Sequence, residues 1–128
     1  MEREKFSVKK RAKSFSYAFN GLRILLREEH NARIHLFGAI IATCAGLYFG
    51  ISRNEWFAVV ISIGLVIILE IINSSIENIA DFISPEYHEM IKKIKDLSAS
   101  AVLIGAITAL VIGMIVFLPK ILALCSNC

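Results

Sequence analysis

Two long stretches without a charged side chain constrain this chain more than any other feature. Residues 34–52 and residues 97–119 contain no Asp, Glu, Lys or Arg. Each stretch is long enough to cross a hydrocarbon core of about 30 Å as an α-helix. Residues 56–69 are also uncharged but too short, so a third span requires the helix to continue past Glu70. We therefore expect an all-α integral membrane protein with spans at 34–52, 56–82 and 97–119.

The composition agrees with a membrane location. The chain has 128 residues, of which 56% are hydrophobic, and its mean hydropathy is +0.66. A soluble domain of this size has too small an interior to bury so many apolar side chains. The polar segment before residue 34 is far longer than the n-region of a signal peptide, so we expect the first span to be retained. The expected partner is the lipid bilayer and not a nucleic acid.

Residues 1–33 are basic and partly amphipathic. A cationic cluster is followed by apolar side chains at helical spacing. The cluster contains Lys9, Lys10, Arg11 and Lys13, and the apolar side chains are Phe15, Phe19, Leu22, Leu25 and Leu26. The pattern predicts a helix lying in the membrane interface. A helix packed on a protein partner is the alternative.

The distribution of Lys and Arg predicts the topology. Residues 1–33 contain nine of these cations, and the loop before the third span contains Lys92, Lys93 and Lys95. The loop after the first span has only Arg53, and the tail at 120–128 has only Lys120. The positive-inside rule therefore places the N-terminus and the second loop in the cytoplasm. The tail is expected to fray, and its Cys125 and Cys128 leave pairing or metal binding open.

The second span carries a polar stripe. Glu70, Asn73, Glu77 and Asp81 occur at i, i+3, i+7 and i+11, which places them on one helix face about 80° wide. A carboxylate inside a span costs at least ~2.5 kcal/mol unless it meets a cation or water. A divalent cation or the cations of a nucleotide site would offset that cost. Alternatively, Glu77 and Asp81 are only the solvated end of a long helix.

Charged side chains also stand beside the cytoplasmic ends of the other two spans. Glu29 and Arg33 precede the first span, and Lys95 and Asp96 precede the third. We expect these ends to converge on a carboxylate-rich pocket that can hold a metal. Phosphoryl transfer uses such parts: metal ions on phosphate oxygens, a cation near the developing charge, and a group that deprotonates the acceptor.

Several motifs together resemble the prokaryotic diacylglycerol kinase family, which includes the undecaprenol kinases. The resemblance covers roughly residues 10–120. It rests on Glu70-Ile-Ile-Asn73-Ser-Ser-Ile-Glu77-x-x-x-Asp81, Ser84-Pro85-Glu86-Tyr87-His88, Lys95-Asp96, Ala101-Val102-Leu103 and, before the first span, Gly21-Leu22-Arg23, Glu29 and Arg33. It implies three transmembrane helices with an N-terminal amphipathic surface helix, assembled as a homotrimer. Active sites between subunits would lie near the cytoplasmic face of the bacterial inner membrane and would use ATP and Mg²⁺.

The resemblance also assigns roles. Glu70 matches the general base, and Glu29 and Glu77 match the carboxylates that hold Mg²⁺ on ATP. Nucleotide contacts are implied for Lys10, Tyr17, Glu86, Tyr87, His88, Lys95 and Asp96, with Asn73, Asp81 and Arg33 in supporting positions. Lys10 stands where some members have Arg, which weakens its assignment. The alternatives are an interfacial anchor for Tyr87, an ordinary loop histidine for His88, and attraction of anionic lipid for Lys10.

The lipid acceptor is the least determined part of this interpretation. Members that favour diacylglycerol often carry an acidic residue where this chain has His35. The segment Arg33-Ile34-His35 and the ending Phe117-Leu118-Pro119-Lys120 resemble the undecaprenol kinases more. Undecaprenol is therefore the favoured acceptor and diacylglycerol the second. Two other classes stay open at this point: a small ion- or proton-coupled transporter that uses Glu70, and a membrane subunit without chemistry.

Overall fold

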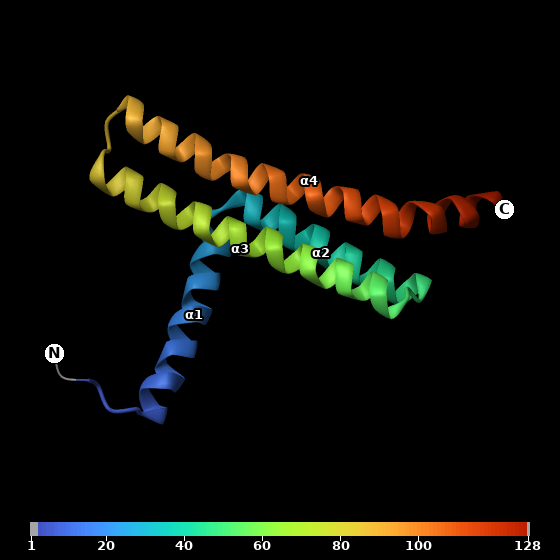
Figure 1. Cartoon of the computed structure of the whole chain (residues 1–128), viewed down its shortest axis with the longest axis horizontal. Coiled ribbons are helices and arrows are strands. Elements are labelled where there is room, and N and C mark those ends of the chain that lie inside the picture. Colours follow the sequence, from blue (N-terminus) through green and yellow to red (C-terminus); the bar gives the residue numbers. More distant parts are fainter. Residues whose placement is uncertain (1–2, 128) are drawn as a thin grey trace.

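The computed structural model describes residues 3–127 and contains four α-helices (Figure 1). They are α1 (Val8–Glu28), α2 (His30–Phe49), α3 (Arg53–Ile83) and α4 (Glu89–Ser126). α2, α3 and α4 lie side by side as a bundle, and α1 projects from it at a steep angle. The helices α2, α3 and α4 are each long and apolar enough to cross a membrane. The prediction of an all-helical chain with three candidate spans is confirmed.

The corner between α1 and α2 is built by Glu29 and Arg33. Glu29 has an extended backbone (φ −108°, ψ 112°), so the helix that starts at residue 8 stops there and α2 starts at His30. The Arg33 guanidinium donates hydrogen bonds to the carbonyl oxygens of Leu26, at 2.5 Å, and of Arg27. These carbonyls end α1 without helical partners, and a cation is favourable there. Arg33 therefore caps α1 and fixes the corner.

The corner lies part of the way along α3, so α3 and α4 extend past it as a two-helix hairpin (Figure 1). We call residues 70–98 the hairpin end of the bundle. The opposite part, residues 46–59 and 112–120, is the turn end. In it, Gly50 adopts the left-handed conformation (φ 59°, ψ 52°) that closes α2, and Ser52 and Glu55 form a capping box that starts α3.

The described part of α4 is longer than the sequence predicted. Residues 120–126 were expected to be a tail, but α4 continues through Pro119 to Ser126. A proline removes only one backbone donor, and apolar surroundings favour keeping the remaining helical hydrogen bonds. The Lys120 amine also donates to the Val116 carbonyl at 3.1 Å and to Glu55 at 2.5 Å. Cys128 lies outside the described residues, so the pairing of Cys125 and Cys128 stays open.

Two glycines leave space for side chains of α3 to pack against the neighbouring helices. A Cβ added to Gly46 would lie 2.7 Å from the Trp56 ring, and one added to Gly105 would lie 2.5 Å from a Leu69 methyl group. Both distances are far below van der Waals contact, so only glycine allows these side chains to approach. The first contact joins α2 to α3, and the second joins α3 to α4.

Candidate active site

The centre of the candidate site is Glu70 of α3, which is only 2% exposed. Its Oε1 lies 3.1 Å from Nε2 of His35 on α2, which is an ion-pair distance for a protonated ring. The two groups do not have hydrogen-bond geometry, and Oε1 accepts no hydrogen bond within residues 3–127. Buried carboxylates are normally hydrogen-bonded, so an oxygen left without a partner needs an explanation.

Glu29 approaches the same place from the α1–α2 corner. Its Oε1 accepts a hydrogen bond from the Ser74 hydroxyl at 3.2 Å, one helical turn from Glu70. Asn78 donates to the Ser74 carbonyl at 2.8 Å and keeps this part of α3 ordered. Glu29 and Glu77 lie close enough to Glu70 for their charges to repel its carboxylate. We call Glu29, Glu70 and Glu77 the carboxylate cluster.

The polar stripe of α3 divides between two neighbouring helices. The oxygen Oδ1 of Asn73 accepts a hydrogen bond from Ser98 of α4 at 2.8 Å, and Asp81 pairs with Lys95 of α4 at 2.8 Å. Glu70, in contrast, faces His35 of α2. The stripe thus contacts α2 along one edge and α4 along the other.

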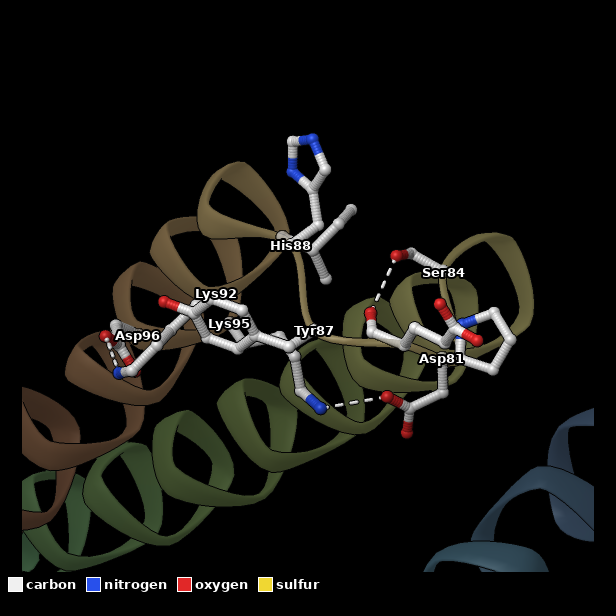
Figure 2. A pocket seen from close by; sticks show the side chains of 10 residues that line it. Asp81, Ser84, Tyr87, His88, Lys92, Lys95 and Asp96 are labelled. Carbon is white, nitrogen blue, oxygen red and sulfur yellow. Dashed lines mark hydrogen bonds and ion pairs between the residues drawn. The ribbon is translucent and has the colours of Figure 1, made fainter.

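A second feature is an open cleft of about 260 Å³ at the tip of the hairpin (Figure 2). We call it the hairpin cleft. Its lining comes from the end of α3, the connecting loop and the start of α4: Asp81, Ser84, Pro85, Glu86, Tyr87, His88, Ile91, Lys92, Lys95 and Asp96. Six of the residues singled out from the sequence therefore lie around one cleft.

Two ion pairs fix the cations of this cleft. The Lys95 amine is 2.8 Å from Oδ1 of Asp81, and the Lys92 amine is 2.7 Å from Oδ2 of Asp96 (Figure 2). Lys95 and Asp96 are adjacent in the sequence, yet each is paired with a different residue. Glu77 is also close enough to Lys95 for electrostatic attraction. Within the carboxylate cluster, Glu77 is therefore the member that also interacts with the hairpin cleft.

The loop residues of the cleft have local structural contacts as well. Nδ1 of His88 accepts a hydrogen bond from the Met90 backbone at 3.1 Å, so His88 is the N-cap of α4. Its ring points away from the Lys95–Asp81 pair in Figure 2. The Ser84 hydroxyl donates to the Glu86 carbonyl at 3.0 Å and closes the turn. Tyr87 is 79% exposed.

Lys10 and Tyr17 do not join either group within one chain. Both are on α1, which leads away from the bundle (Figure 1). The Lys10 amine pairs with Glu4 at 3.1 Å, and Tyr17 is 70% exposed. Together with neighbouring residues they line a hollow on α1 itself. One chain therefore brings together the carboxylate cluster and the hairpin cleft but leaves these two predicted nucleotide contacts apart.

Three polar residues of the site were not selected from the sequence: His35, Ser74 and Ser98. His35 had served only as an indication of the preferred lipid. A signal existed for each, because Ser74 follows Glu70 by one turn, Ser98 follows Lys95-Asp96, and a histidine within an apolar span is unusual. Their partners, however, come from other helices and are far apart in the sequence.

Comparison with known proteins agrees with the geometry. Residues 16–117 match the family described as "Prokaryotic diacylglycerol kinase". The chain is 34% identical over 109 residues to the undecaprenol kinase of Bacillus subtilis (strain 168), covering 85% of this chain and 89% of the relative. It is 33% identical over 112 residues to a diacylglycerol kinase of Synechocystis, covering 87% of this chain and 64% of the relative.

A third relative is the diacylglycerol kinase of Escherichia coli (strain K12), which is 32% identical over 99 residues, 77% of this chain and 81% of the relative. The interpretation as a transporter receives no support from these matches. The family match covers most of the chain and includes every residue of the carboxylate cluster and the hairpin cleft. The chain therefore belongs to the prokaryotic diacylglycerol kinase family and is a lipid kinase.

Proposed function

We propose that this protein transfers the γ-phosphate of ATP to the hydroxyl of a membrane lipid alcohol, with undecaprenol favoured over diacylglycerol. The observation that carries the proposal is the buried carboxylate of Glu70, whose Oε1 accepts no hydrogen bond in the described chain. A buried base whose oxygen accepts no hydrogen bond, next to two more carboxylates and a cationic cleft, suits an acceptor group that arrives from the membrane.

Glu70 is the proposed general base. It takes the proton of the lipid hydroxyl while the hydroxyl oxygen forms a bond to the γ-phosphorus. The bond between that phosphorus and the bridging oxygen breaks, and its electron pair leaves with ADP. Exclusion of water around Glu70, which is 2% exposed, keeps its carboxylate for the lipid and limits hydrolysis of ATP.

The hairpin cleft is the proposed nucleotide site. Its Lys95 is paired with Asp81 at 2.8 Å, and a bound phosphate would compete with Asp81 for the amine. In that position Lys95 neutralises charge on the transferred phosphoryl group. The loop from Glu86 to His88 would contact the rest of the nucleotide, and Asp96 would help to position it.

Mg²⁺ fits the carboxylate cluster, with one restriction. Among residues 3–127 no group of three or more His, Cys, Asp or Glu side chains forms a ready metal site. Mg²⁺ in kinases is usually held by one or two carboxylates together with phosphates and water, so such a group is not required. Glu29 and Glu77, whose charges act on Glu70, would hold it. The bound metal would neutralise charge on the ATP phosphates.

We also propose a homotrimer with α1 on the cytoplasmic surface of the bacterial inner membrane. The support is the placement of Lys10 and Tyr17, which one chain leaves far from its own site. An adjacent subunit could bring them to the hairpin cleft. The projection of α1 at the level of the corner (Figure 1) suits a helix lying along a membrane plane, with the hairpin end in the cytoplasm.

Undecaprenol as acceptor rests on sequence similarity. The product would be undecaprenyl phosphate, whereas diacylglycerol would give phosphatidic acid. His35, which replaces the acidic residue often found in members that favour diacylglycerol, contacts Glu70 at 3.1 Å. The residue that differs between the two groups thus lies beside the proposed base.

The test is a phosphorylation assay on purified protein in mixed micelles with Mg²⁺ and radiolabelled ATP, offering undecaprenol and diacylglycerol in parallel. We expect label mainly in undecaprenol. Label mainly in diacylglycerol would retain the kinase reaction and contradict the acceptor. Absence of label from both lipids, in a sample shown to be folded, would contradict the proposed reaction.

A further inference from the structure

His35 lies beside the proposed base and also lines an apolar groove of the bundle. Its Nε2 is 3.1 Å from the buried Oε1 of Glu70. The same residue also lines an apolar groove of about 570 Å³ formed by α2, α3 and α4. Among the described residues that line this groove, His35 is the only titratable one. Its side chain is 25% exposed, whereas that of Glu70 is 3% exposed.

Glu70 needs a group in that position. Glu29 and Glu77 repel its charge, and His35 is the group that attracts it. The Oε1 atom accepts no hydrogen bond in the part of the chain described here. A carboxylate that accepts no hydrogen bond can rotate about its terminal bond, and a general base works only when one oxygen stays directed at the proton it removes.

We propose that His35 is a positioning residue: its Nε2–H holds Oε1 of Glu70, so that the other carboxylate oxygen faces the lipid hydroxyl. The inference rests on the proposed function, because it assigns His35 a part in the same reaction. The present distance of 3.1 Å without hydrogen-bond alignment suits this role, since hydrogen bonds between catalytic groups often align only when the substrate is bound.

Side-chain geometry provides a sharp test. Glutamine carries its amide nitrogen at the ε position, as His35 does with Nε2, while asparagine carries it one bond shorter. His35→Gln should therefore retain the contact with Glu70, and His35→Asn should lose it. His35→Ala removes the group altogether. Thr43→Ala is the matched control, because Thr43 is a polar residue of α2 whose hydroxyl bonds only the Ala39 carbonyl within the described chain.

Lipid phosphorylation should be measured over a range of lipid concentrations at saturating Mg·ATP, and over a range of Mg·ATP concentrations at a fixed high lipid concentration, with the unfolding midpoint of each variant. We expect His35→Ala and His35→Asn to lower kcat by roughly ten- to a hundredfold, because each removes one hydrogen bond to a charged group. The KM for Mg·ATP should change less than about twofold, because His35 does not line the hairpin cleft. His35→Gln should restore most of kcat, and Thr43→Ala should match the wild type.

The outcomes separate the inference from the function it rests on. An inactive wild-type protein contradicts the proposed function itself. An active wild type with unchanged kcat in His35→Ala overturns the positioning role and leaves the kinase intact. Equal losses in His35→Gln and His35→Ala, accompanied by a lower unfolding midpoint, would show a merely structural residue. A rise in lipid KM without a fall in kcat would show a lipid contact instead of a positioning residue.

Discussion

Two glutamates of α3 lie beside neighbouring helices, Glu55 at the start of α3 and Glu70 near its middle, and their contacts differ. At the turn end, Glu55 accepts hydrogen bonds from the Ser52 backbone at 3.1 Å and from Lys120 of α4 at 2.5 Å. At the hairpin end, Glu70 is more deeply buried, yet its Oε1 accepts no hydrogen bond within residues 3–127. Glu70 is also repelled by Glu29 and Glu77.

The difference is the one expected between a structural carboxylate and the proposed general base. Glu55 caps the start of α3 and pairs with Lys120 of α4, and these two contacts engage both of its carboxylate oxygens. Glu70 has one close polar contact, His35 at 3.1 Å, and its Oε1 accepts no hydrogen bond in the described chain, so its burial costs free energy that hydrogen bonds do not offset. This contrast supports the proposal that Glu70 is the general base, because carboxylates in perturbed environments cluster at functional sites.

The strongest test of this comparison is the same substitution at both ends. Glu70→Gln keeps the volume and removes the base, so we expect kcat for lipid phosphorylation to fall by at least about a hundredfold. Binding of Mg·ATP should persist, because loss of a base affects the transition state more than the ground state. Steady-state kinetics and nucleotide titration measure the two quantities.

Glu55→Gln is the matched control on the same helix. It weakens the pair with Lys120 and the capping box, so we expect a lower unfolding midpoint with kcat per folded molecule within about twofold of wild type. Activity of Glu70→Gln within a few-fold of wild type would show that Glu70 is not the base, and the contrast between the two glutamates would then lose its functional meaning.

Glu77 tests whether the carboxylate cluster and the hairpin cleft act as one site. It interacts with both Glu70 and Lys95, and Mg²⁺ would need its charge. Glu77→Gln should weaken Mg·ATP binding about tenfold, with little change in the binding of metal-free ATP. Calorimetric titration with and without Mg²⁺ gives both values. Equal affinities for Mg·ATP in the variant and the wild type would argue against the metal role.

Much of the fold followed from the sequence because the signals that predict a membrane span lie within the span itself. Length and absence of charge located three candidate spans, and the polar stripe from Glu70 to Asp81 marked the hairpin end. The continuation of α4 beyond Pro119 was missed, since a proline ends most soluble helices. Here α4 continues past Pro119, and Lys120, directly after the proline, contacts Glu55 and the Val116 carbonyl.

The site was predictable only in part, for a geometric reason. A helical wheel places Glu70 and Asp81 on one face, but it cannot show that α2 lies against one edge of that face and α4 against the other. The contact of His35 with Glu70 depends on that packing. The separation of Lys10 and Tyr17 from the rest of the site likewise depends on the direction of α1 (Figure 1).

The smallest expected effect on activity is at the turn end, at Gly46. A Cβ there would lie 2.7 Å from the Trp56 ring, so Gly46→Ala must displace the indole. Overpacking of this kind costs typically ~1–3 kcal/mol, which should lower the unfolding midpoint while kcat per folded molecule stays within about twofold. Gly64→Ala is the control, because an added Cβ meets no atom within 4 Å among residues 3–127, apart from its chain neighbours and the backbone of its own helix. Its unfolding midpoint should stay the same or rise, since alanine favours a helix more than glycine does. Loss of kcat in folded Gly46→Ala, without loss in Gly64→Ala, would show that the turn end transmits strain to Glu70 and that the two ends are not independent.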